Sequence, residues 1–432
     1  MKTSTPLYST SWLIFEKLIF IALSFVVTLT LARHLMPALF GELNYLMALV
    51  ALVSPLMAVG LNSIITREVI QRPSDNDVIM GSGLALRFFA GLLVLPIAIA
   101  LGYVYLESDQ RHLFAFLIVC SLSNTALLID FWLQAHVANP YAAMVRLITL
   151  IVFSVARLVA VWVDSGLSVF VYLVGLEFVF VALLYLLVYH RFGAGLGKLR
   201  VSLPECNRLW SDSRWLFVSS IAAVIYLKMD QIMLGILVDD RAVGIYAAAA
   251  RISEVWYFIP VAIVTSFFPA LINAKSSDTS LYQNDLQRLN DLLFVSALVI
   301  AFGVSLTASW GIEKLFGITY AEAASVLIVH TWVGIFVFMR VLLSKWFITE
   351  NLLKLSMFSQ VLGAFANIFL NAQLIPLYGP IGAAYATVIS FSVAGYLVLF
   401  LHRDLWPMAL VVTRSLLLPL RLLQKGRNLY SR

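Results

Sequence analysis

Residues 168–190, SVFVYLVGLEFVFVALLYLLVYH, carry one charged side chain, Glu177, over a length that can cross a bilayer. A helix needs ~20 mainly apolar residues to span the hydrocarbon. Similar stretches recur along the chain, which has 62% hydrophobic and 12% charged residues and a mean hydropathy of +0.94. Soluble domains have roughly 25% charged residues. The sequence therefore predicts an all-α polytopic membrane protein.

Twelve such stretches predict about twelve transmembrane helices. The spans are residues 12–32, 42–66, 83–106, 112–134, 143–163, 168–190, 213–237, 245–273, 291–310, 323–345, 352–377 and 380–401. A basic, glycine-rich interruption follows the sixth span and divides the chain into two sets of six. We therefore expect an N-terminal six-helix lobe (1–190), a cytoplasmic linker (191–212), a C-terminal six-helix lobe (213–401) and a basic cytoplasmic tail (402–432) able to form an amphipathic surface helix.

The Lys and Arg residues outside the spans predict the orientation. Eighteen lie on the side of the N-terminus, and four lie on the other side: Arg33, Arg111, Arg241 and Lys314. Cytoplasmic loops carry the excess of Lys and Arg. Both termini should therefore face the cytoplasm, and much of the +6 net charge reflects topology and requires no nucleic-acid partner.

Charged residues inside the spans are the main functional signal. A charge at the bilayer centre costs at least ~2.5 to 3.5 kcal/mol on insertion scales, so several of them need a shared reason to be there. The bases exceed the acids, which suggests an anionic substrate. The bases are Lys17, Arg87, Arg146, Arg157, Lys228, Arg251 and Arg340, and the acids are Glu16, Asp130, Glu177, Asp230 and Glu254.

Five of these bases are the candidate substrate-binding residues: Lys17, Arg146, Arg157, Lys228 and Arg251. Arg87 and Arg340 lie near cytoplasmic span ends, where snorkelling explains them better. Some acids must pair with bases, because an unpaired buried charge is more costly than a paired one. Charge pairing and coupling to an ion therefore both remain open for Asp130, Glu177, Asp230 and Glu254.

Helix breakers occur in the second span of each lobe. They are Pro55 and Gly60 in the first lobe, and Pro260 and Pro269 in the second. Interruptions at matching positions of two repeats indicate moving or binding elements of a transporter, although an ordinary tolerated kink explains them equally well. We treat these four residues as candidate hinges.

The chain offers little for catalysis. Its loops are short, and it contains no glycine-rich phosphate loop, HExxH motif or Cys/His ligand cluster. We therefore expect no catalytic residue, no metal site, no cofactor and no enzymatic activity. Coupling to H⁺ or Na⁺ is the one accessory role left open.

A block around the seventh and eighth spans carries a family resemblance. Residues 225–235 (IYLKMDQIMLG), 243–246 (VGIY) and 251–260 (RISEVWYFIP) resemble the bacterial polysaccharide-biosynthesis flippases of the multidrug/oligosaccharidyl-lipid/polysaccharide exporter superfamily. Residues 60–62 (GLN), 67–68 (RE) and 374–387 (LIPLYGPIGAAYAT) fit as well. The resemblance implies two lobes around a central cationic cavity that work by alternating access.

The resemblance also implies a substrate and a location. The substrate would be a polyprenyl-pyrophosphate-linked oligosaccharide, such as an O-antigen repeat unit, and the location the bacterial inner membrane. Lys and Arg suit that role, because they form charge-assisted hydrogen bonds to phosphate. We expect a functional monomer in contact with membrane lipid and with other polysaccharide-assembly proteins as candidate partners. The alternatives are a cation-coupled multidrug exporter and a membrane-embedded glycosyltransferase or polymerase component.

Overall fold

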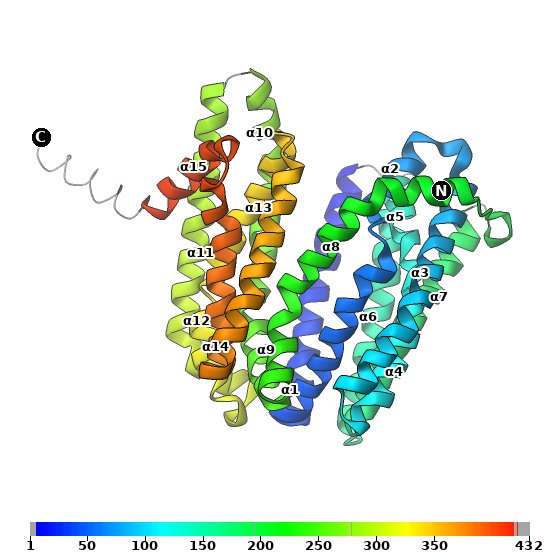
Figure 1. Cartoon of the computed structure of the whole chain (residues 1–432), viewed down its shortest axis with the longest axis horizontal. Coiled ribbons are helices and arrows are strands. Elements are labelled where there is room, and N and C mark those ends of the chain that lie inside the picture. The colour runs from blue at the N-terminus through cyan, green and yellow to red at the C-terminus, as the bar shows by residue number, and fades with distance from the viewer. Residues whose placement is uncertain (1–5, 194, 278, 419–420, 422–432) are drawn as a thin grey trace, which may run out of the picture. The chain divides into compact units, whose positions relative to one another are not determined.

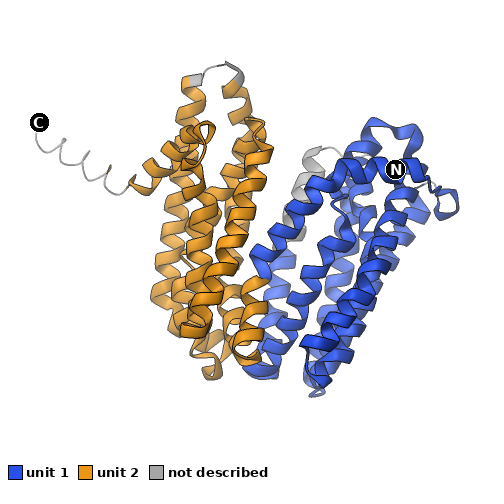
Figure 2. Ribbon diagram, in the orientation of Figure 1, with its two compact units in different colours: residues 1–228 blue, residues 229–432 orange. Residues whose placement is uncertain are grey.

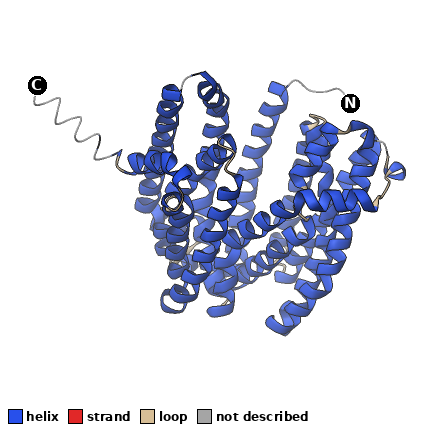
Figure 3. Ribbon diagram, turned by 45° about the horizontal axis from the view of Figure 1, so that its top comes forward, coloured by secondary structure: helices blue, strands red, loops and turns tan. Residues whose placement is uncertain are grey.

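The computed structural model describes residues 6–193, 195–277, 279–418 and 421, and helices joined by short connections make up this part of the chain (Figure 3). Side chains are described from residue 19 onward, apart from those of 194, 276–279, 419–420 and 422–432. No strand occurs within these ranges. The all-α class predicted from the sequence is confirmed.

Ten helical segments of the described chain are long and apolar enough to cross a membrane. Two of them, Ile19–Gln71 and Leu353–Phe400, have 53 and 48 residues. At ~1.5 Å per residue, either is more than twice as long as the ~30 Å hydrocarbon core. Helix α1 (Pro6–Ala58) is two helices joined at Met36 (φ 60°), and α14 (Leu353–Gly395) is two helices joined at Gly379 (φ 56°). Counting each segment as two spans gives the twelve predicted.

The N-terminal compact unit comprises residues 1–228 (Figure 2). Within it α6 packs against α1 and α7, and α4 packs against α3 and α7. After α1 its helices are α2 (Asn62–Gln71), α3 (Asn76–Tyr105), α4 (Ser108–Ser121), α5 (Leu128–Ala135), α6 (Asn139–Trp162), α7 (Leu167–Phe192) and the first part of α8 (Leu203–Leu237), with 3₁₀ turns at Pro73–Asp75, Leu122–Leu127 and Leu196–Lys198.

The C-terminal compact unit comprises residues 229–432. Within it α11 packs against α10, α12, α13 and α15, and α9 packs against α12 and α14 (Figure 1). Its helices are the end of α8, α9 (Asp240–Glu254), α10 (Phe258–Ser277), α11 (Thr279–Phe316), α12 (Ala323–His330), α13 (Val333–Thr349), α14 and α15 (Trp406–Leu416), with 3₁₀ turns at Val255–Tyr257, Ile318–Tyr320, Leu397–Phe400 and Arg403–Leu405.

The predicted linker, residues 191–212, packs on the N-terminal unit. It includes the start of α8, and the chain passes from one compact unit to the other inside that helix, after Lys228. Glu68 of α2 is 2% exposed and accepts hydrogen bonds from Arg72, 3.1 Å away, and from Arg208 of α8. Arg72 also donates to Glu205 at 2.5 Å, and this hydrogen bond raises the pKa of the Arg72 guanidinium. This network ties α8 to α2.

The helix breaks completely at Gly60, between α1 and α2. The span predicted over 42–66 is therefore wrong in its last residues, because α1 ends before them. The last helical residue of α1 is Ala58, and Val59 and Gly60 both have positive φ, 55° and 66°. A Cβ on Gly60 would lie 2.5 Å from the backbone nitrogen of Phe217 in α8. Glycine is therefore required both for its φ and for the close approach of α8.

The matching helix of the second unit is also broken, just before Pro260. Helix α9 ends at Glu254, a 3₁₀ turn covers Val255–Tyr257, and α10 starts at Phe258. Proline lacks the N–H that would bond to the carbonyl of Trp256, which favours a break there. Pro55 and Pro269 lie inside α1 and α10, and their hinge role stays a prediction.

The tail begins with a packed helix. Helix α15 buries Met408, Ala409, Val411, Val412 and Ser415, and it packs on α11. Its other face exposes Leu410 and Trp406. Most of the basic, leucine-rich segment predicted as a surface helix lies beyond α15, outside the described residues.

Candidate functional site

Two of the predicted cations in the N-terminal unit have carboxylate partners on neighbouring helices. Arg146 of α6 donates to Asp130 of α5 at 2.9 Å, and Tyr185 donates to the same carboxylate at 3.2 Å. Arg157 of α6 is paired with Glu177 of α7. All four charged side chains are partly buried, between 16% and 29% exposed. The expected pairing of intramembrane charges is therefore found in this unit.

Arg87 differs from its prediction. The residue is 3% exposed and donates to the Asn62 side chain, so snorkelling is wrong for it. Arg340 is partly buried and donates to the carbonyl oxygen of Ala394 at 2.8 Å and to Ser359 at 3.3 Å. Both arginines bond to groups of their own unit, which a cation reaching out to the membrane interface would not do.

Lys228 and Arg251 are different, because the described residues offer neither of them an ion pair. Lys228 is a partly buried residue of α8, nine residues before its end, and belongs to the N-terminal unit. Arg251 belongs to the C-terminal unit and is exposed on α9, eleven residues after its start. At ~1.5 Å per residue, these positions are about 14 Å and 17 Å along the helix axes, deep within a ~30 Å hydrocarbon core.

Glu254 is exposed on α9 three residues after Arg251, but the described side chains contain no ion pair between them. An unpaired arginine facing lipid at this depth would cost at least ~2.5 to 3.5 kcal/mol. The arrangement therefore favours contact with water, rather than with lipid, for the segment of α9 that contains Arg251 and Glu254. Lys17, the fifth predicted cation, lies in the part of α1 whose side chains are outside the described set.

Asp230 is the centre of a buried polar cluster in the C-terminal unit, and it is 3% exposed. One carboxylate oxygen accepts from Asn367 at 2.9 Å and from Asn371 at 2.6 Å, both on α14. The other accepts from Tyr246 of α9 at 2.6 Å and from Thr387 of α14 at 2.7 Å. All four donors are neutral, and no base pairs with this carboxylate among the residues described.

The sequence prediction missed these four partners. Asn367 and Asn371 are four residues apart in an apolar segment and therefore share a helix face, which is a readable signal for a polar site inside a membrane. Small residues bring the cluster together: Ala247, Ala248 and Ala249 of α9 are buried, which allows α9 to pack closely on its neighbours. Nothing in the sequence around Tyr246 indicated that its hydroxyl would donate to Asp230.

The comparisons with known proteins agree with this architecture. The family described as polysaccharide biosynthesis protein matches residues 7–275. The probable low-salt glycan biosynthesis flippase Agl15 of Haloferax volcanii is 28% identical over 206 residues, which cover 46% of this chain and 43% of that protein. The chain thus matches less than half the length of that relative.

Two solved structures share the fold over most of both chains. An inward-facing multidrug resistance MATE family transporter of the MOP superfamily has a TM-score of 0.72 at 15% identity, covering 91% of this chain and 94% of its own. The lipid II flippase MurJ in an inward closed conformation has a TM-score of 0.66 at 15% identity, covering 93% and 91%. Because the family match extends over more than half of the 432 residues, the chain belongs to the polysaccharide biosynthesis protein family, and it has the fold of MOP superfamily transporters.

Proposed function

We propose that this protein is a flippase that moves a polyprenyl-pyrophosphate-linked oligosaccharide, such as an O-antigen repeat unit, across the bacterial inner membrane by alternating access. The family match, the flippase named among its relatives and the fold shared with a lipid II flippase support this proposal. The protein acts as a transporter and not as an enzyme. Other polysaccharide-assembly membrane proteins are its candidate partners, and it works as a monomer.

The observation that carries the proposal is that Arg251, deep in the apolar part of the C-terminal unit, has no ion pair among the described residues, and the same holds for Lys228 in the N-terminal unit. A diphosphate that leaves water must regain interactions worth many kcal/mol, and Lys and Arg provide them through charge-assisted hydrogen bonds. Arg146 and Arg157 already have carboxylate partners, so we assign them to positioning their helices. We therefore propose Lys228 and Arg251 as headgroup contacts, and Lys17, whose side chain lies outside the described set, stays a prediction.

The alternatives fit less well. A multidrug exporter of cationic compounds would favour an acid-rich cavity, whereas the seven bases inside the spans outnumber the five acids. The fold that the chain shares with a MATE transporter is equally compatible with either substrate, because fold does not determine function. A glycosyltransferase or polymerase component would need a catalytic centre, and the described residues contain no group of three or more potential metal ligands.

Removing the protein from its host tests the function directly. We expect polyprenyl-pyrophosphate-linked oligosaccharide to accumulate, as measured by mass spectrometry of extracted lipids, and the wild-type gene to reverse the accumulation. The glycan released from the lipid would identify the substrate. Unchanged lipid-linked sugars together with increased sensitivity to cationic drugs would instead support the exporter.

The proposed topology places both termini in the cytoplasm, and two matched serines can test it. Ser74 and Ser108 are exposed, and each donates to the aspartate that follows it. With Cys120 and Cys206 replaced by serine, a membrane-impermeant maleimide applied to intact cells should label Ser108→Cys and leave Ser74→Cys unlabelled. Detergent should expose both. The opposite labelling would reverse the proposed orientation.

A further inference from the structure

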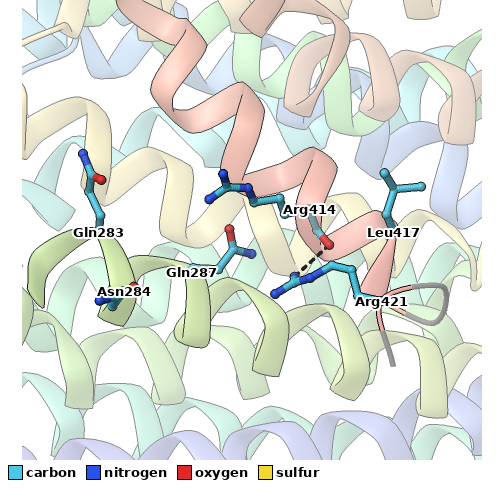
Figure 4. Close-up of a pocket in the computed structure, with 6 residues that line it drawn as sticks. All are labelled: Gln283, Asn284, Gln287, Arg414, Leu417 and Arg421. Atoms are coloured by element: carbon cyan, nitrogen blue, oxygen red, sulfur yellow. Dashed lines mark hydrogen bonds between the residues drawn. The ribbon is translucent and has the colours of Figure 1, made fainter. Parts of the chain in front are cut away.

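A cavity of about 450 Å³ lies between the first turns of α11 and the region of α15 (Figure 4). Two arginines, three side-chain amides and one leucine line it, and no carboxylate does: Gln283, Asn284, Gln287, Arg414, Leu417 and Arg421. The lining is thus rich in hydrogen-bond donors and positively charged. It belongs entirely to the C-terminal unit and is separate from Arg251 and Asp230.

Helix α15 is held in place next to this cavity by buried hydrogen bonds. Ser415 donates to Asp291 of α11 at 2.6 Å and accepts from Asn290 at 2.8 Å. Gln287 also donates to Ser415, at 3.0 Å. Because Ser415 is fixed, the backbone of the preceding residue, Arg414, is fixed as well. The backbone that carries Arg414 is therefore preorganised, which lowers the cost of binding.

The two guanidinium groups are not neutralised equally. Nη1 of Arg421 donates to the backbone oxygen of Arg414 at 3.0 Å (Figure 4). The same nitrogen lies 3.4 Å from Asp291. The Arg414 guanidinium has no partner in the described part of the chain. Only Arg421 therefore has a carboxylate within ion-pair distance, and the charge of Arg414 is left as an excess positive charge of the cavity.

This chemistry fits a phosphate group. Arginine presents a planar set of donors that matches phosphoryl oxygens, and amide side chains add neutral donors. Leu417 in the cavity lining and Leu410 of α15 are 46% and 58% exposed, which offers apolar surface to an attached acyl chain. We propose that this cavity binds a phosphate-bearing anion, supplied either by the headgroup of an acidic phospholipid or by a soluble phosphate compound.

Native mass spectrometry of the purified full-length protein in detergent tests the proposal. The probes are phosphatidylglycerol, phosphatidylcholine and inorganic phosphate. We expect wild-type protein to retain phosphatidylglycerol in preference to phosphatidylcholine. An Arg414→Gln/Arg421→Gln variant should bind phosphatidylglycerol at least about tenfold more weakly. Hydrogen bonds to charged groups typically contribute enough free energy for a tenfold change in affinity. Displacement by inorganic phosphate would identify a soluble ligand, and resistance to displacement would identify the lipid.

Two further variants keep the test decisive. Arg288→Gln removes the same charge from the same end of α11, but its side chain is 82% exposed and lies outside the cavity lining, so binding should be unchanged. Arg414→Gln alone breaks no described side-chain contact and should weaken binding without lowering the thermal midpoint. The proposal is overturned if Arg414→Gln binds like wild type, or if Arg288→Gln loses as much binding as the double variant.

Discussion

Arg251→Ala should slow the transfer of lipid-linked oligosaccharide about 30-fold or more, because losing the charged partner of a desolvated phosphate costs at least ~2 kcal/mol. The measurement is the rate of transfer between leaflets of proteoliposomes at equal protein content. Arg251→Lys should recover part of the rate, since it keeps the charge but loses bidentate hydrogen bonding. In the other unit, Lys228→Arg should likewise be faster than Lys228→Gln.

The matched control for Arg251 is Arg241, the same residue type at the start of the same helix. Arg241 forms two hydrogen bonds to Glu322, at 2.9 and 3.0 Å, and holds the pKa of that carboxyl below its usual value. Both side chains are at least half exposed, so Arg241→Ala should change transport little. Equal transport by Arg251→Ala and wild type would contradict the headgroup role.

A second control separates headgroup binding from a pairing role with Glu254. If Arg251 only neutralises that acid, the double variant Arg251→Ala/Glu254→Ala should regain transport. A headgroup contact predicts that the double variant stays as slow as Arg251→Ala, because the phosphate still lacks its donor. Thermal midpoints of both variants, compared with wild type, would show whether either change acts by unfolding the protein.

The spans could be predicted from sequence because hydropathy is a local property. Breaks caused by special residues could be predicted too, as at Gly60 and Pro260. The 3₁₀ turn at Leu122–Leu127 contains neither glycine nor proline, so it could not be predicted from these residues. It lies in the fourth span of the first unit, and its conformation depends on packing against α3 and α7.

The partners of the charged residues could not be predicted, because they come from other helices. Arg146 and Asp130 are 16 residues apart, and Arg157 and Glu177 are 20 apart. Their pairing depends on how α5, α6 and α7 pack. The sequence showed that some charges must be neutralised, but only the packing separates the paired arginines from Arg251. The contact between Arg208 and Glu68 could not be predicted for the same reason, since these residues are 140 positions apart.

Asp230 presents the remaining problem, a buried carboxylate surrounded by neutral donors. Four hydrogen bonds stabilise the Asp230 carboxylate, but no positive charge among the described residues compensates it, which makes the site a candidate for binding a cation. Asn371 Oδ1 is buried without a hydrogen-bond partner in the described structure, and Asn367 and Thr387 contribute further oxygens nearby. Oxygen ligands of this kind suit a hard cation such as Na⁺. We therefore propose Asp230, rather than the exposed Glu254, as the ion-coupling residue.

Asp230→Asn should abolish the dependence of transport on an imposed Na⁺ or H⁺ gradient, while Glu254→Gln should keep it. The variant should also lose about 1 to 3 kcal/mol of stability, because the new NH2 group replaces a carboxylate oxygen and cannot accept the hydrogen bonds that this oxygen accepted. A binding test needs no transport assay. If the ion is Na⁺, replacing K⁺ by Na⁺ at constant ionic strength should raise the thermal midpoint of wild type and leave that of Asp230→Asn unchanged. A midpoint that responds to pH in wild type alone would indicate a proton. Gradient dependence that survives in Asp230→Asn would rule out the coupling role and leave the cluster as a device that holds α8, α9 and α14 together.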